Sequence, residues 1–122
     1  MGETLVVVDN VRLCIDANDV TRIAEYWAAL FGYRIREVDG EDSWRHLEPP
    51  GPMLPKLTIQ PVPEQKVLKN RLHLDVFVTD PEPWITRCVE LGGTRLWRQE
   101  DPDDWFQVIG DPEGNEFCIC RS

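Results

Sequence analysis

The chain has 122 residues, of which 42% are hydrophobic and 29% charged, as in a soluble globular protein of one domain. Its formal net charge of -9 argues against nucleic-acid binding, because the phosphate backbone is bound by clustered Lys and Arg. The first residues lack the basic region of a signal peptide, and the apolar run there is too short for a membrane span. We therefore expect a cytoplasmic protein with neither a membrane nor a nucleic acid as partner.

The first half of the chain predicts one helix among four strands. Apolar residues alternate from 11 to 15, which is typical of a strand with one packed face. Asn18 and Asp19 offer N-cap chemistry, and Gly32 is expected to end the helix that follows. The apolar face of that helix is Val20, Ile23, Ala24, Trp27, Leu30 and Phe31. Three further strands are predicted at 33–38, 43–48 and 56–61, separated by glycine and proline turns.

The second half predicts the same order of elements. Residues 62–70 are expected to be a connection, and 71–79 a strand. A helix should begin at Asp80-Pro81 and stop at Gly92-Gly93. Its expected buried stripe is Trp84, Ile85, Cys88 and Leu91. Strands are predicted at 94–98, 105–109 and 116–121, and a tight turn at 111–115 joins the last two.

An internal repeat supports this reading. The strand RLCID at 12–16 returns as RLHLD at 71–75, and each copy is followed by a helix and a glycine turn. Two long units do not make a solenoid, which needs three or more. We therefore predict one α+β domain over 1–122, with module one at about 9–61, a linker at 62–70 and module two at about 71–121. Any binding site is expected where the two modules meet.

Three segments resemble a known family: YWAALFGY at 26–33, NRLHLD at 70–75 and DPEGNEF at 111–117. Together they are similar to the glyoxalase-like domain of the glyoxalase/bleomycin-resistance/extradiol-dioxygenase superfamily, also called vicinal oxygen chelate. The resemblance covers nearly the whole chain. It implies two β-α-β-β-β modules whose curled mixed sheets enclose a shared cavity. Metal-dependent relatives hold an ion there with side chains from four strands.

The ligand positions implied by the resemblance make a poor metal site. They are Arg12 or Cys14; one of Lys56, Thr58 and Gln60; His73; and Cys118, with Glu116 two residues before it. A divalent ion needs several anionic or neutral donors, whereas Arg12 and Lys56 would bring positive charge toward it. We therefore expect a cavity without metal or cofactor, in which His73 bonds to a protein group or to the ligand.

Other candidate residues keep two readings. Arg12 should either pair with a carboxylate such as Asp75 or Glu116 or bind an anionic ligand, and pairing is favoured because unpaired buried charge is costly. Cys14 and Cys118 are more simply small space-filling residues than nucleophiles. Trp44, Trp97 and Trp105 either stack on a ring-shaped ligand or pack on the sheet. The acidic residues of 100–104 are most simply a solvated loop.

Three functions are compatible with these residues. The first is a glyoxalase-like protein that binds or modifies an aromatic or oxygenated small molecule without a catalytic metal. Its expected ligand-binding residues are Arg12, Cys14, Thr58, Gln60, His73, Trp105 and Cys118, with no catalytic residue assigned. The second is a metal-dependent lyase, isomerase or dioxygenase using His73 with Cys118 or Glu116. The third is a dimeric interaction module with a vestigial cavity. A homodimer is expected, since symmetric pairs are the commonest soluble assemblies.

Overall fold

The computed structural model describes residues 8, 10–36, 40 and 43–122. The first module contains β1 (Arg12–Ala17), α1 (Val20–Phe31), β2 (Arg34–Ile35), β3 (Arg45–Glu48) and β4 (Lys56–Pro61). The second contains β5 (Asp75–Val78), α2 (Pro81–Glu90), β6 (Thr94–Glu100), β7 (Trp105–Gly110) and β8 (Glu116–Arg121). The predicted order, β-α-β-β-β twice, is confirmed.

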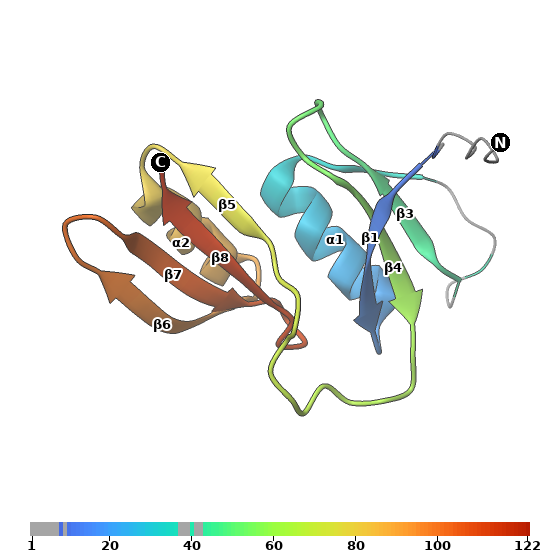
Figure 1. Cartoon of the computed structure of the whole chain (residues 1–122). Helices are drawn as coiled ribbons and strands as arrows, with labels where there is room; N and C mark the ends of the chain where they lie inside the picture. Colours follow the sequence, from blue (N-terminus) through green and yellow to red (C-terminus); the bar gives the residue numbers. More distant parts are fainter. Residues whose placement is uncertain (1–7, 9, 37–39, 41–42) are drawn as a thin grey trace, which may run out of the picture.

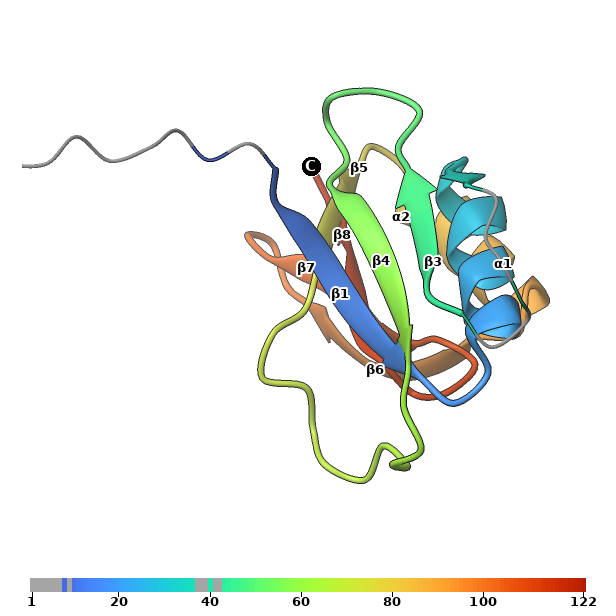
Figure 2. The same cartoon turned by 90° about the vertical axis from the view of Figure 1, so that its right-hand side faces the viewer.

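Each module forms a four-stranded mixed sheet, in the orders β1-β4-β3-β2 and β5-β8-β7-β6. The first strand of each module pairs in parallel with the last one, and the other pairs are antiparallel. The sheets lie side by side and are not closed on one another (Figure 1). Both helices lie on the same side of the molecule (Figure 2). The opposite face of each sheet, called its outer face below, is therefore free of helix.

Helix α1 follows the sequence prediction closely. All six residues of its expected apolar face are buried. The Asp19 carboxylate accepts a hydrogen bond from the Arg22 backbone N–H at 3.1 Å, which satisfies one of the unpaired donors of the first turn. Gly32 ends the helix with φ at 76°, a left-handed conformation that other residues adopt reluctantly.

The two modules share one core because α1 packs against elements of both. The Trp27 and Phe117 ring centroids lie 4.7 Å apart, which joins α1 to β8. The Tyr26 hydroxyl donates to the Cys88 carbonyl of α2 at 3.3 Å. Buried residues of both halves form a single apolar cluster. The relative position of the modules is therefore fixed by packing rather than by the linker alone.

The turn between β7 and β8 clamps the modules together. The buried Asp111 carboxylate accepts hydrogen bonds from Trp27 Nε1 at 3.1 Å, Asn115 Nδ2 at 3.0 Å and the backbone N–H groups of Glu113 and Asn115 at 2.9 Å each. Glu113 accepts from the backbone N–H groups just before α1, at 2.6 and 2.7 Å. A carboxylate there also meets the positive end of the helix dipole. The acidic turn is thus a structural joint.

Some predicted boundaries differ from the structure. Strand β5 begins at Asp75 instead of 71, because the Asn70 side chain accepts the Glu116 backbone N–H at 3.1 Å, where a paired strand would bond. Trp84 was expected to be buried, yet it is 36% exposed and stacks on Phe31 at the module boundary. Strand β6 extends to Glu100. Part of the strand predicted at 33–38 lies outside the described residues. Within the described ranges, no helix is long and apolar enough to span a membrane.

Candidate functional site

The outer face of the second sheet holds a cavity of about 470 Å³, which we call the second-module cavity. Strand β8 turns Phe117 and Ile119 into the shared core, so the alternate residues Cys118 and Cys120 face the cavity. Its volume is within the range of ordinary small-molecule pockets. Its aromatic lining is Phe77, Trp97, Trp105 and Phe106.

Burial keeps the cavity floor uncharged. Desolvation and the neighbouring Asp75 carboxylate raise the pKa of Cys118 to about 12. Desolvation, with Asp75 and Asp104, raises the pKa of Cys120 to about 11. Both side chains are therefore thiols at neutral pH, which disfavours a nucleophilic role because the thiolate is the reactive form.

A polar cluster lies at one side of this cavity. His73 Nε2 is 3.2 Å from Asp75 Oδ1, and the Cys118 thiol bonds to the same carboxylate. One potential ligand atom from each of these three residues lies within 4.8 Å of the others. An imidazole, a carboxylate and a thiol are the donor types that zinc accepts. The cluster could hold a divalent ion, and its members also satisfy one another without one.

A second hollow, the intermodule cavity, lies between β1 and the segment leading into β5 and measures about 500 Å³. Its apolar lining is Leu13, Ile15, Trp27, Leu57, Leu72 and Leu74. Cys14 and Asp16 contribute from β1. His73 and Glu116 line both cavities, so the two hollows adjoin at these residues.

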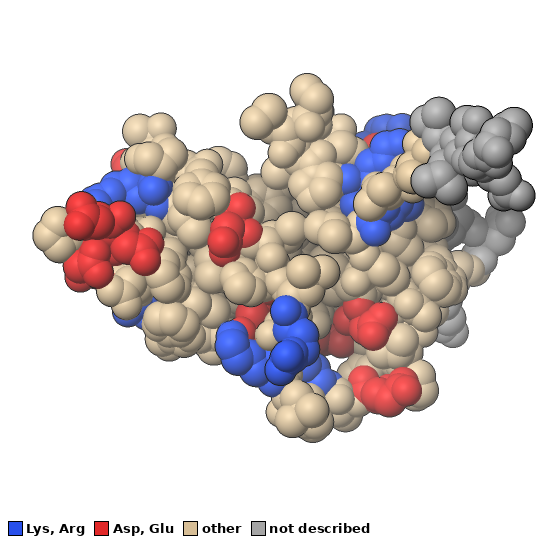
Figure 3. Space-filling view, in the orientation of Figure 1, with Lys and Arg blue, Asp and Glu red and all other residues tan. Residues whose placement is uncertain are grey.

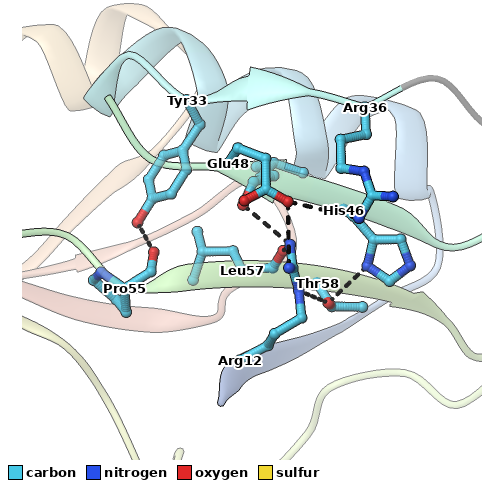
Figure 4. A network of polar contacts seen from close by, with 9 residues as sticks. Arg12, Tyr33, Arg36, His46, Glu48, Pro55, Leu57 and Thr58 are labelled. Carbon is cyan, nitrogen blue, oxygen red and sulfur yellow. Dashed lines mark hydrogen bonds and ion pairs between the residues drawn. The ribbon is translucent and has the colours of Figure 1, made fainter. Parts of the chain in front are cut away.

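The outer face of the first sheet carries a network centred on Arg12 (Figure 4). Arg12 donates to Thr58 Oγ1 at 2.8 Å, to Glu48 at 3.3 Å and to the carbonyls of Leu47 and Leu57 at 3.3 and 2.9 Å. Sequence reasoning expected a carboxylate partner and named Asp75 or Glu116. The partner is Glu48 of β3, because β4 pairs with both β1 and β3 and brings their outer faces together.

His46 completes the Arg12 network. Its Nδ1 lies 3.0 Å from Thr58 Oγ1. Desolvation is the main cause that lowers the pKa of His46, and the positive charges of Arg12 and Arg36 lower it further. The ring is therefore neutral at pH 7, and Arg36 shares the Glu48 carboxylate at 3.6 Å. The side chains of this network are bonded mainly to one another, so they form an ordered part of the protein surface.

The expected ligand-binding residues are thus divided among three places. His73, Trp105 and Cys118 line the second-module cavity, whereas Cys14 lines the intermodule cavity with His73. Arg12, Thr58 and Gln60 lie on β1 and β4 of the first module, and Gln60 accepts a bond from the Cys14 thiol at 3.4 Å. Lys56 is paired in register with Arg12, so within one chain both cations belong to the first sheet.

Sequence reasoning missed several lining residues. Asp75 was considered only as a partner for Arg12, although it lies two positions after His73 in the strand predicted at 71–79, where alternate residues share a face. Phe77 continues that face, so the alternation would have revealed both residues. Phe106 and Asp104 carried no such signal in the sequence, because their positions depend on how β6 and β7 pair in the hairpin.

The chain thus has two β-α-β-β-β modules with open sheets and a cavity of ligand size on one sheet. These features place it among small α+β domains built from paired modules. A family model described as a glyoxalase-like domain matches residues 12–120. The chain belongs to this family. No curated protein sequence matches it.

Solved structures share the fold at low sequence identity. A glyoxalase/bleomycin resistance protein/dioxygenase family enzyme from Burkholderia phytofirmans PsJN has 17% identity and a TM-score of 0.70 over 90% of this chain and 95% of that one. The fosfomycin resistance protein FosX of Listeria monocytogenes has 9% identity and a TM-score of 0.73 over 96% and 95%. The bleomycin-binding protein of Streptomyces verticillus, complexed with copper(II)-bleomycin, has 18% identity and a TM-score of 0.63 over 97% and 99%.

Proposed function

We propose that the protein binds an aromatic or oxygenated small molecule in the second-module cavity without a catalytic metal. The observation that carries this proposal is a hollow of about 470 Å³ that combines aromatic walls, a neutral floor and an imidazole at its side. Flat aromatic surface and a few convergent polar groups are the usual elements of a small-molecule pocket. Relatives of the same fold include a fosfomycin resistance protein and a bleomycin-binding protein, which supports small-molecule binding as a class.

His73 is the polar residue best placed to orient a ligand. It is partly exposed, lines both cavities and is held by Asp75 through Nε2. That bond leaves Nδ1 available to a ligand group. In the neutral tautomer that donates Nε2–H to the Asp75 carboxylate, Nδ1 can accept one hydrogen bond from a ligand.

The proposal is tested by native mass spectrometry of the purified protein together with binding measurements on the compound it carries. His73→Ala should weaken binding roughly tenfold, the effect of losing one hydrogen bond. His46→Ala is the matched control, since that ring bonds to Thr58 on the first sheet and should leave affinity unchanged. Equal affinity in wild type and His73→Ala would contradict the role of His73. A sample that binds no small molecule would favour the interaction module with a vestigial cavity.

A metal-dependent lyase, isomerase or dioxygenase is the second candidate, favoured by the grouping of His73, Asp75 and Cys118. Three protein ligands are the number typical of catalytic zinc sites. A metal ion would have to displace the proton of the Cys118 thiol, and this is opposed because desolvation and Asp75 raise the pKa of that thiol. The metal-free function is favoured because the Asp75 carboxylate already binds His73 Nε2 and the Cys118 thiol, and because the raised pKa of Cys118 opposes the loss of its proton.

We further propose a cytoplasmic homodimer. The four cysteines are free thiols, as expected in a reducing compartment. Val67, Leu68 and Leu72 are 83%, 80% and 74% exposed and lie outside the second-module cavity, and a second copy over such surface would remove it from water. The same native spectrum should show a particle of twice the 14.1 kDa chain mass. A monomer alone at a concentration of about 10 µM would contradict the pairing.

A further inference from the structure

We propose that the second-module cavity selects planar aromatic cations. This inference rests on the proposed small-molecule function and adds the charge and shape of the ligand. It is carried by the aromatic walls of the cavity and by the acidic residues at its rim.

The aromatic walls present unusually open ring surface. Phe77 is 65% exposed and Trp97 is 52% exposed, although both belong to a sheet face. Trp97 meets Phe106 edge to face, with ring centroids 5.3 Å apart, so the two rings brace one another. Val108 and the thiols of Cys118 and Cys120 form the apolar floor. A flat ring can lie on this floor and against these walls without burying an unpaired polar group.

The rim carries more negative than positive charge. Four of the lining residues are acids, Asp75, Asp103, Asp104 and Glu116, and two are bases, Lys69 and Arg121. Lys69 is already paired with Glu116 at 3.0 Å. Acidic side chains gather over the β6–β7 hairpin, at the left end of the view in Figure 3. The net charge of -9 on the whole chain adds to the attraction for a cation.

Two of these acids are available to a ligand. Among the described residues, neither the Asp103 nor the Asp104 carboxylate forms an ion pair with Lys or Arg. Asp104 is close enough to Cys120 to affect that thiol, so its charge acts at the floor of the cavity. Asp75, by contrast, is held by His73 and Cys118.

The chain itself shows a cation on one of these rings. The Arg98 guanidinium carbon lies 4.6 Å from the centroid of Trp105, in cation–π geometry. Arg98 is also paired with Glu82 of α2 at 2.9 Å and does not line the cavity, so it shows the attraction without filling the site. A positively charged ring against Trp97 would use the same attraction, since the faces of aromatic rings are electron-rich.

Two acridines of one shape and opposite charge test the inference by fluorescence titration. The probes are 9-aminoacridine, a cation at pH 7, and acridine-9-carboxylate, an anion. We expect 9-aminoacridine to bind at least about tenfold more tightly at low ionic strength. The difference should narrow as salt rises from about 0.02 M to about 0.5 M, because exposed carboxylates are screened.

Variants locate the site and separate the two proposals. Trp97→Ala should weaken both probes, with Phe77→Ala as a second wall variant. Asp104→Asn should weaken only the binding of 9-aminoacridine. Glu90→Gln, an equal change of charge at the exposed end of α2, should leave the affinity for both probes unchanged. Equal binding of both probes, reduced by Trp97→Ala, would overturn the charge selection and leave the aromatic site standing. Binding of neither probe would overturn this inference and the aromatic ligand of the proposed function together.

Discussion

Replacing Asp111 with alanine should lower the free energy of unfolding by about 3 kcal/mol, measured by urea denaturation. The carboxylate is buried and accepts four hydrogen bonds. Without it, Trp27 Nε1–H and two backbone N–H groups lose their acceptor inside the protein. Each buried unsatisfied group costs roughly 1–3 kcal/mol, and partial relaxation keeps the total below the sum.

Two further variants identify the origin of this loss. Asp101→Ala is the control, because Asp101 also accepts backbone N–H groups in a turn but is exposed to solvent, so its loss should change stability little. Trp27→Phe should cost less in the Asp111→Ala background than in the wild type, since the bond it removes is already absent. Additive effects of the two changes would contradict a direct clamp between α1 and the β7–β8 turn.

Gly93→Ala should also destabilise the fold by about 3 kcal/mol, at the upper end of overpacking costs. A Cβ at Gly93 would lie 2.9 Å from the carbonyl oxygens of both Cys88 and Gly110, and would also collide with the Tyr26 hydroxyl. The Tyr26 side chain is buried and hydrogen-bonded, and the two carbonyls belong to the backbone of α2 and β7. The substitution therefore forces backbone of both elements to shift.

Gly51→Ala is the matched control for this prediction. Nothing lies within 4 Å of a Cβ at Gly51, so the change should be neutral or should stabilise by about 0.5 kcal/mol through the unfolded chain. Thermal or urea unfolding of the two variants beside the wild type gives the comparison. Equal stability of Gly93→Ala and Gly51→Ala would show that the α2–β6 junction is looser than the structure indicates.

The sequence carried enough information for the fold because its signals are local and repeated. Asp19, the apolar face of α1 and Gly32 each predict their own part of the helix, and the structure bears them out. The second copy of the strand motif then implies the second module. The start of β5 was wrong by several residues because a single side-chain bond, from Glu116 to Asn70, decides it. No periodic pattern reports such a bond.

The site was harder to predict because it depends on which strands become neighbours. His73 and Cys118 were expected to face one cavity, since family positions and strand alternation agree on them, and both line the second-module cavity. Arg12 does pair with a carboxylate, as expected, but the examples named were Asp75 and Glu116 of the second module, because the Glu48 contact requires the register of β1, β4 and β3. The acidic residues of 100–104 were expected to form a solvated loop. Asp103 and Asp104 are exposed, and they also line the second-module cavity.

The central claim is a small-molecule cavity that needs no catalytic metal, and elemental analysis of protein purified without chelators tests it most directly. The account predicts Zn, Ni and Fe at background in the wild type and in His73→Ala alike. The hydrogen bonds among His73, Asp75 and Cys118 stabilise the cluster as it stands. One equivalent of Zn, Ni or Fe in the wild type, lost in His73→Ala, would contradict this account and establish the metal-dependent function in its place.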